Sequence, residues 1–152
     1  MKKRWIYGAL CLIWMFVIFG MSNAQGEESQ GMSDTIVIFL SKILPFVSYN
    51  DTWTFIVRKL AHFSEYAILG MLYYLFFSTY RIIGKKQILI LIGCVFAYAC
   101  SDEFHQLFME GRAGQFRDVC IDTAGGATGI LLWHWIYTYL LKYKQKRMPH
   151  EI

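Results

Sequence analysis

Long apolar runs bordered by short basic clusters constrain the fold of this chain more than any other feature of its sequence. The first run, 5–21, follows Lys2, Lys3 and Arg4. A helix rises about 1.5 Å per residue, so about 20 apolar residues cross the roughly 30 Å hydrocarbon core of a bilayer. With 56% hydrophobic and 18% aromatic residues, the chain is also too apolar for an ordinary soluble domain. The sequence therefore predicts a membrane protein.

Three further apolar runs predict an all-α protein with four transmembrane helices, the last three at about 59–80, 88–109 and 119–141. In the third span the uninterrupted apolar part ends at Cys100, which is too early to cross a bilayer. We therefore expect this helix to continue toward Met109, which carries its acidic residues into the depth of the bilayer.

The segment 22–58 separates the first two predicted spans. Its beginning, 23–31, is rich in Gly, Ser, Gln and Glu, which is a loop composition. Ser33 or Asp34 then caps a short helix that ends before Pro45. This helix is too short to cross a bilayer, so we expect an amphipathic helix at the outer surface or a packed re-entrant piece. Its apolar residues are Ile36, Val37, Leu40, Ile43 and Leu44.

Three basic clusters, at 2–4, 81–86 and 142–147, predict the orientation of this single 1–152 domain. With four spans they all lie on one side, which the positive-inside rule makes cytoplasmic, together with both termini. Because these residues border apolar runs and form no extended basic face, nucleic-acid binding is not expected. The first run can also be interpreted as a signal peptide cleaved after Ala24, but its length favours retention.

The second predicted span carries a polar face near its outer end. His62 lies four residues after Arg58 and three before Glu65, so these side chains share one face of a helix. Tyr66 joins that face, and Lys59 borders the same run. At about 1.5 Å per residue, Glu65 lies about 10 Å deeper than Arg58, which places it in the outer leaflet.

The third and fourth predicted spans carry similar faces. Asp102, His105 and Gln106 share a face on the third span, with Glu103 one position around the helix. On the fourth span the acidic pair is followed by a GxxxG pair, a small-residue face that lets another helix approach closely. These residues are Asp118, Asp122, Gly125 and Gly129, with Gly126 beside them. Because charged groups at bilayer depth rarely face lipid, we expect the three faces to converge on a pocket open to the outside.

The outer cluster contains more acids than bases. Its six acids are Glu65, Asp102, Glu103, Glu110, Asp118 and Asp122, and its four bases are Arg58, Lys59, Arg112 and Arg117. A purely structural ion-pair network, the alternative interpretation, would not need the surplus. The excess charge requires protonation, charged histidines, a bound cation or a ligand amine, which favours a functional site.

His62 and His105 are the candidate acid–base groups, since each has a carboxylate three residues away that can orient its imidazole. Arg112 and Arg117 suit a phosphate or carboxylate through forked hydrogen bonds, although snorkelling to lipid head groups explains them equally well. Two histidines with carboxylates can also bind zinc or manganese, but these ligands come from different helices at no recognised spacing. The sequence therefore predicts no metal and no cofactor.

The four cysteines form no CxxC pair, which favours small buried side chains. Cys100 and Cys120 would both lie near the outer face, where a disulfide remains an alternative.

The same residues resemble the signature of the VanZ-like family. The similar segments are 59–66 (KLAHFSEY), 102–106 (DEFHQ), Gly111-Arg112, Arg117-Asp118 and Asp122 with the GxxxG glycines. The resemblance covers 59–129 by motif and the whole chain by its number of spans. Members of this family are small bacterial membrane proteins, and the namesake is associated with teicoplanin resistance.

The resemblance implies an envelope-related role on the outer face, where glycopeptides and lipid-linked wall precursors are found. The positions that carry over from the family are His62, Glu65, Asp102, Glu103, Gln106, Arg112 and Asp118. Asp122 stands where many relatives carry Asn, which adds a negative charge to an acidic site.

Two functions remain open at this point. In the first, the pocket binds or modifies a lipid or wall-precursor head group. The catalytic candidates are His62, Glu65, Asp102, Glu103, His105, Gln106, Asp118 and Asp122, and the substrate-binding candidates are Lys59, Tyr66, Arg112 and Arg117. In the second, a non-catalytic scaffold uses the same network to fix its helices and presents the outer helix to a partner. Ion or proton movement is weaker, because the polar residues do not continue across the cytoplasmic half.

Overall fold

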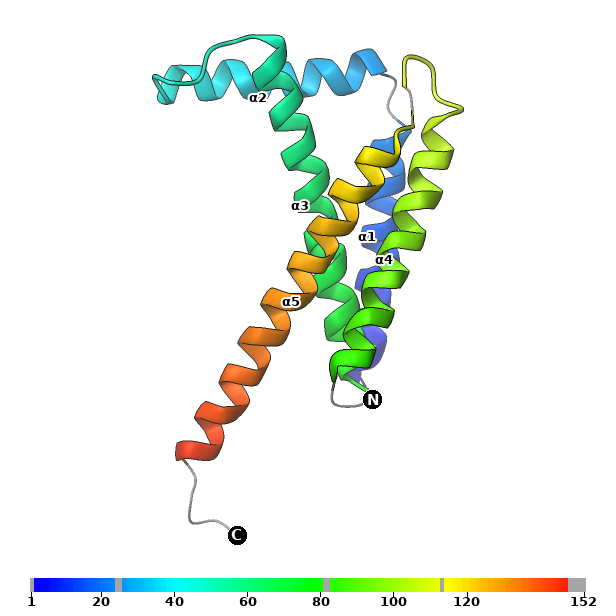
Figure 1. The fold of residues 1–152 in the computed structure, drawn as a ribbon, viewed down its shortest axis with the longest axis vertical. Helices are drawn as coiled ribbons and strands as arrows, with labels where there is room; N and C mark the ends of the chain where they lie inside the picture. Colours follow the sequence, from blue (N-terminus) through cyan, green and yellow to red (C-terminus); the bar gives the residue numbers. More distant parts are fainter. Residues whose placement is uncertain (1, 24–25, 81–82, 113, 148–152) are drawn as a thin grey trace.

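The computed structural model describes residues 2–23, 26–80, 83–112 and 114–147. Within these ranges the protein contains five helices and no strand, which confirms the all-α class. The helices are α1 (Lys2–Ser22), α2 (Gly26–Ile43), α3 (Asp51–Ser78), α4 (Lys85–Gln106) and α5 (Phe116–Arg147). Figure 1 shows α1, α3 and α4 side by side, α5 crossing them, and α2 lying across one end of this bundle.

Three of the described helices, α1, α3 and α4, are long and apolar enough to cross a membrane. Although α5 has 32 residues, it is not among them. Its glycines and threonines, Asp122 and several Trp, Tyr and His side chains lower its mean hydropathy. Three helices therefore fit the prediction of a membrane protein.

The beginning of α2 differs from the prediction, because the helix starts at Gly26 where 23–31 was expected to be a loop. Glu27 and Glu28 lie in its first turn, where negative charge stabilises the positive end of the helix dipole. Ser33 does not cap the helix, since its hydroxyl donates a hydrogen bond to a carbonyl oxygen one turn earlier within it. As predicted, the helix ends before Pro45.

The other helix ends also differ from the predicted spans. α3 begins at Asp51, because the side-chain oxygen of Asn50 accepts a hydrogen bond from the Trp53 amide at 3.0 Å and caps the first turn. α4 ends at Gln106, three residues early, since the next three amides bond back only three residues in tight turns. α5 extends beyond 119–141 at both ends.

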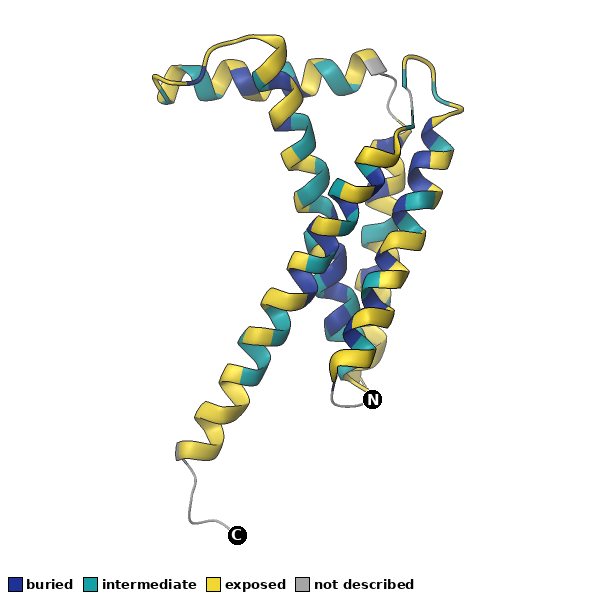
Figure 2. Cartoon of the chain, viewed as in Figure 1, coloured by how far each residue is buried: buried dark blue, intermediate teal, exposed yellow. Residues whose placement is uncertain are grey.

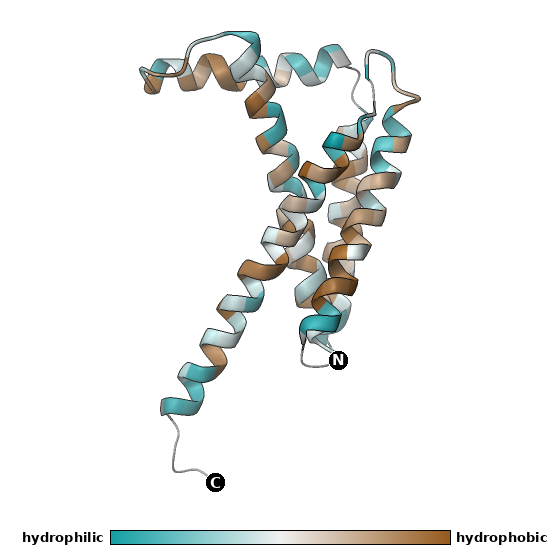
Figure 3. Cartoon of the chain, viewed as in Figure 1, coloured by the Kyte–Doolittle hydropathy of each residue, from teal (hydrophilic) through white to brown (hydrophobic). Residues whose placement is uncertain are grey.

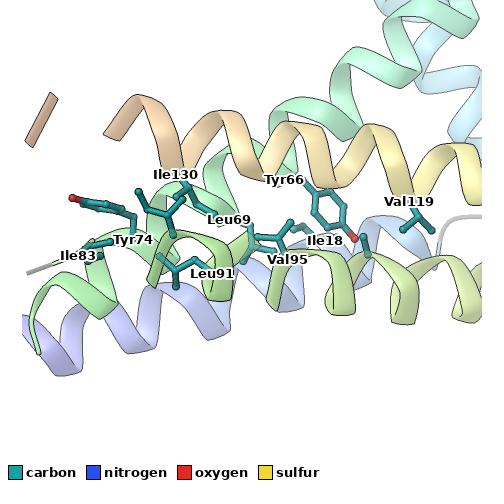
Figure 4. Packing of buried hydrophobic residues seen from close by; sticks show 11 residues of the cluster. Ile18, Tyr66, Leu69, Tyr74, Ile83, Leu91, Val95, Val119 and Ile130 are labelled. Carbon is teal, nitrogen blue, oxygen red and sulfur yellow. The ribbon is translucent and has the colours of Figure 1, made fainter. Parts of the chain in front are cut away.

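The apolar core lies where α1, α3, α4 and α5 meet, and Figure 2 shows the buried residues gathered on these inner faces. Figure 4 shows its side chains interleaved between the four helices. Its members are Ile18 of α1, Tyr66, Leu69 and Tyr74 of α3, Ile88, Leu91, Val95 and Ala99 of α4, Val119 and Ile130 of α5, and Ile83 before α4.

A close backbone contact joins α3 to the glycine face of α5. A Cβ atom on Gly125 would collide with the carbonyl oxygen of Phe63, and one on Gly129 with the carbonyl oxygen of Ala67. The predicted GxxxG contact is therefore confirmed, with α3 as the approaching helix. This contact holds the first turns of α5 against the polar face of α3.

α2 packs on the first turns of α3 at the end of the bundle. Val37 of α2, Val57 of α3 and Val47 between them form a small apolar cluster. Beside it, the Thr54 hydroxyl donates a hydrogen bond to Asp34 Oδ1 at 2.7 Å. These contacts fix α2 next to the polar residues of α3.

Candidate functional site

A pocket of about 240 Å³ opens at the end of the bundle where α2 lies. The polar faces of α3, α4 and α5 meet here, as Figure 3 shows by the hydrophilic residues near this end. Four cationic side chains line the pocket, those of Arg58, Lys59, Arg112 and Arg117, and Asp118 is the carboxylate among its described lining residues. Ser29, Phe55, His62, Gln106, Gly111 and Gln115 complete the lining. The pocket is therefore basic.

An ion pair joins α3 to α5 at the pocket. Lys59 Nζ lies 2.6 Å from Asp118 Oδ2, and both side chains are 15% exposed. The Phe55 ring lies against two cations, 5.3 Å from Lys59 Nζ and 5.2 Å from Arg117 Cζ. Arg117 Nε is 3.9 Å from the second oxygen of Asp118, too far for a hydrogen bond. The charges of Lys59 and Asp118 thus offset each other.

The other two guanidinium groups of the pocket have only neutral hydrogen-bond partners among the described residues. Arg58 Nη1 lies 3.4 Å from Gln30 Oε1 of α2, and Arg112 Nη2 lies 3.4 Å from the carbonyl oxygen of Met21 at the end of α1. Both contacts are long for hydrogen bonds. These two arginines therefore retain donors for an anion.

The loop between α4 and α5 places Arg112 over the bundle. Gly111 has φ 72°, a left-handed conformation that glycine adopts without strain. The Gln115 amide donates a hydrogen bond to Glu103 Oε2 at 2.9 Å. A Cβ atom on Gly114 would collide with the Glu103 carbonyl oxygen, so the loop is seated directly on α4.

Carboxylates lie near the Arg112 guanidinium. Burial lowers the pKa of Arg112 from its usual range and the neighbouring Arg58 adds to this, whereas the carboxylates of Asp102, Glu103 and Glu65 raise it. An arginine side chain stays protonated at physiological pH. The pocket therefore keeps this positive charge.

Three carboxylates are buried beneath the pocket: Asp102 is 3% exposed, Glu103 5% and Asp122 1%. Asp102 Oδ2 accepts a hydrogen bond from Gln106 Nε2 at 3.3 Å, so a pocket residue links this group to the pocket. Both oxygens of Asp122 lack a hydrogen-bond partner among the described residues. The site thus has a basic wall and an acidic floor, and the predicted surplus of acid lies in the floor.

The two histidines lie in different surroundings. His62 lines the pocket, and its Nδ1 is 4.0 Å from Glu65 Oε2, close enough for attraction but not for a hydrogen bond. His105 lies outside the pocket lining, with its ring 4.6 Å from that of Phe19 of α1. The structure therefore brings His62 to Glu65 but does not pair His105 with Asp102.

Tyr66 lies with the floor and not with the basic wall. Its side chain is fully buried, its ring is 6.1 Å from that of Tyr98, and its hydroxyl lies beside the carboxylates of Asp102 and Asp122. Glu110, counted in the outer cluster, is exposed and does not line the pocket.

Some lining residues were not predicted from the sequence. Ser29 belongs to the segment expected to be a loop, and Phe55 precedes the expected start of the second span. The spacing held a signal for Phe55, which lies four residues before Lys59 and so shares its face once α3 is extended to Asp51.

Among the described residues, no three His, Cys, Asp or Glu side chains are placed to share a metal ion. All four cysteines are free, so the alternative disulfide between Cys100 and Cys120 is not formed.

The family model described as VanZ/LLP1 matches residues 7–137, a range that contains every residue of the pocket wall and floor. No curated protein and no solved structure matches the chain.

Proposed function

Because the chain belongs to the VanZ/LLP1 family, we propose that its basic pocket binds or modifies the anionic head group of a cell-envelope lipid or wall precursor. The main support for this proposal is the pair Arg58 and Arg112, whose guanidinium groups line the pocket and have only neutral hydrogen-bond partners among the described residues. A guanidinium presents a planar fork of donors that matches a phosphate group. Phosphate is therefore the anion that we propose.

The size of the pocket favours binding of a lipid head group over enclosure of a whole lipid molecule. At about 240 Å³ it is smaller than the roughly 300–1,000 Å³ of sites that enclose a drug-sized molecule. A phosphate with a few attached atoms fits this volume, and the apolar part of a lipid would stay outside.

The proposal includes the topology predicted from the sequence, with α5 as the fourth span, both termini in the cytoplasm and the pocket on the outer face. Two arrangements support it. The start of α1, the end of α3, the start of α4 and the end of α5 lie at the end of the molecule opposite the pocket (Figure 1). Three of these helix ends carry basic residues, among them Lys2, Lys85 and Lys142. In addition, the glycine face of α5 packs on α3, so its polar first turns do not need to face lipid.

If the pocket modifies its ligand, His62 is the acid–base group that we propose, because it lines the pocket and has Glu65 as a neighbour. Lys59 and Arg117 complete the anion-binding wall. The floor residues Asp102, Glu103 and Asp122 would hold a proton and, through Gln106 of the pocket lining, position the wall. His105 and Tyr66 would support the packing around them.

Binding of a short-chain phosphatidic acid to the purified protein tests the proposal. We expect Arg58→Gln and Arg112→Gln each to weaken binding at least about tenfold, since one charge-assisted hydrogen bond contributes about 1.5–3 kcal/mol. Lys144→Gln, a matched loss of charge at the far end of α5, should leave binding unchanged. Equal affinity of the two arginine variants and the unsubstituted protein would refute the proposal.

The second candidate is a non-catalytic scaffold, which the Lys59–Asp118 ion pair between α3 and α5 favours. In that case Arg112→Gln should lower thermal stability in detergent in step with any loss of function. In the binding function, stability should stay close to that of the unsubstituted protein while binding is lost.

We extend the proposal to glycopeptide resistance, the property associated with the namesake of the family. Expression of the chain in a teicoplanin-sensitive bacterium should raise the minimum inhibitory concentration, and Arg112→Gln should cancel the increase. If the Arg112→Gln variant raises the minimum inhibitory concentration as much as the unsubstituted protein does, resistance does not depend on the pocket.

A further inference from the structure

α2 exposes an apolar stripe that its packing on α3 does not use. The stripe consists of Met32, Ile36, Phe39 and Ile43, which are 48%, 46%, 62% and 60% exposed. The three- and four-residue spacing places these side chains on one face of the helix. The face that packs toward α3 holds Ser33, Val37 and Leu40.

The two faces point in different directions. At about 100° per residue, the centre of the stripe lies about a quarter turn from the centre of the packed face. Glu27, Asp34 and Ser41 lie on the side opposite the stripe. α2 therefore has a packed face, an apolar face and a polar face, and the apolar and polar faces point away from each other.

The position of α2 in the fold indicates what surrounds each of these faces. The helix lies across the end of the bundle that contains α1, α3 and α4, which are long enough to cross a membrane (Figure 1). If these three helices cross the membrane, a helix at this place lies where hydrocarbon meets water. A re-entrant piece buried in protein would cover its apolar residues, whereas here they are exposed. The apolar surface also continues beyond the helix in Phe46, which is 70% exposed.

α2 is connected directly to the pocket. Ser29 of α2 lines it, and Gln30 of α2 contacts Arg58 of the pocket wall. Thr54, one turn before Arg58 on α3, is hydrogen-bonded to Asp34 of α2. The depth of α2 in a bilayer would thus set the depth of the pocket.

We propose that α2 lies in the bilayer interface with Met32, Ile36, Phe39 and Ile43 among the lipids, and that it holds the basic pocket at the level of the lipid phosphates. This inference rests on the proposed function and adds the source of the head group. The phosphate that reaches Arg58 and Arg112 belongs to a lipid of the surrounding membrane and is not drawn from free phosphate compounds in water.

Ile36 and Ile38 provide a matched pair for testing the position of α2. They are the same residue type, 46% and 43% exposed, and point to different sides of one helix. The variants Ile36→Trp and Ile38→Trp are reconstituted into vesicles of phosphatidylcholine and phosphatidylglycerol brominated near the head-group end of the acyl chains. We expect the added fluorescence of Ile36→Trp to be quenched at least twice as strongly as that of Ile38→Trp. Equal quenching, or stronger quenching at 38, overturns the interfacial position.

The source of the head group is tested with two probes, phosphatidic acid in vesicles and glycerol 3-phosphate in solution. Ile36→Asn should weaken binding of the vesicle-borne probe several-fold, and Ile38→Asn should leave it unchanged. Glycerol 3-phosphate should bind at least tenfold more weakly than the lipid. Equal binding of both probes, with no effect of Ile36→Asn, overturns this inference and leaves the basic pocket intact as a phosphate site.

The Arg112→Gln variant separates the two failures. Loss of lipid binding in Arg112→Gln supports the pocket whatever the quenching experiment shows. If Arg112→Gln binds phosphatidic acid as the unsubstituted protein does, the proposed function and the lipid source fail together, while the quenching result still decides the position of α2.

Discussion

At Asp122, a carboxylate with 1% exposure has no hydrogen-bond partner for either oxygen among the described residues. Asp118, one helical turn earlier, lies 2.6 Å from Lys59 Nζ. A buried polar or charged group without a partner costs free energy, whereas removing one member of an ion pair leaves the other without its partner. An amide in place of each aspartate should therefore have opposite effects.

We predict that Asp122→Asn raises the free energy of unfolding by about 1–3 kcal/mol, because an amide is neutral without taking up a proton, whereas a buried carboxyl group without partners must be protonated. Asp118→Asn should lower it by a similar amount, because Lys59 loses its carboxylate. Thermal unfolding in detergent, followed by circular dichroism, measures both. A loss of stability in Asp122→Asn would mean that this carboxylate is paired in solution.

Single residues were predictable where helix periodicity alone placed them. The face shared by Arg58, His62 and Glu65 follows from three- and four-residue spacing. In the structure Arg58 and His62 line the pocket, and Glu65 Oε2 lies 4.0 Å from His62 Nδ1. The predicted pairing of His105 with Asp102 is not formed, because spacing determines which residues share a helix face but not which residues of other helices lie against it. Phe19 of α1 lies against the His105 ring.

Among the elements, α3 and α5 depend most on close packing. A Cβ atom on Gly129 of α5 would collide with the Ala67 carbonyl oxygen, and one on Gly70 of α3 would collide with the Gly126 carbonyl oxygen. Backbone atoms cannot rotate away as a flexible side chain can. Even one methyl group at these positions should push the two helices apart.

We predict that Gly129→Ala lowers the free energy of unfolding by about 1–3 kcal/mol through overpacking. Gly93→Ala in α4 is the matched control, because no atom lies within 4 Å of a Cβ built there. It should raise stability by up to about 1 kcal/mol through better helix propensity. Thermal unfolding of both variants in the same detergent checks the pair. Unchanged stability in Gly129→Ala would contradict the close approach of α5 to α3.

The elements were predictable from their apolar runs, but their ends were not. The start of α2 lies in a polar segment whose composition is typical of a loop, and only its acidic first turn and its packing on α3 explain the helix. The GxxxG pair of α5 identified a close contact, and the structure supplies α3 as its partner.

Across the whole molecule, positive and negative side chains are arranged in layers. The sequence gives a count of charges, and that count shows more acids than bases in the outer cluster. The separation of the cluster into a basic wall and an acidic floor depends on two features. The first is the loop that carries Arg112 over α4, and the second is which faces of α4 and α5 point toward the pocket. Neither is determined by helix periodicity, so the basic character of the pocket could not be predicted.

The proposed topology predicts the side of the membrane on which each end of the molecule lies. Green fluorescent protein fused after the complete chain should fluoresce in bacteria, because it folds in the cytoplasm. The same reporter fused after Ser48, between α2 and α3, should stay dark, and alkaline phosphatase fusions at both sites should show the reverse activities. Fluorescence at both sites would rule out the four-span arrangement.

The buried carboxyl groups beneath the basic wall would limit how far the proposed anion enters the pocket. In the proposed function, Arg58 and Arg112 attract a phosphate to the mouth of the pocket, and the buried carboxyl groups of Asp102, Glu103 and Asp122 offer it no counter-charge further in. A bound head group would therefore rest at the rim with its outward side in contact with water. A second protein or a soluble antibiotic could reach the lipid there without entering the membrane.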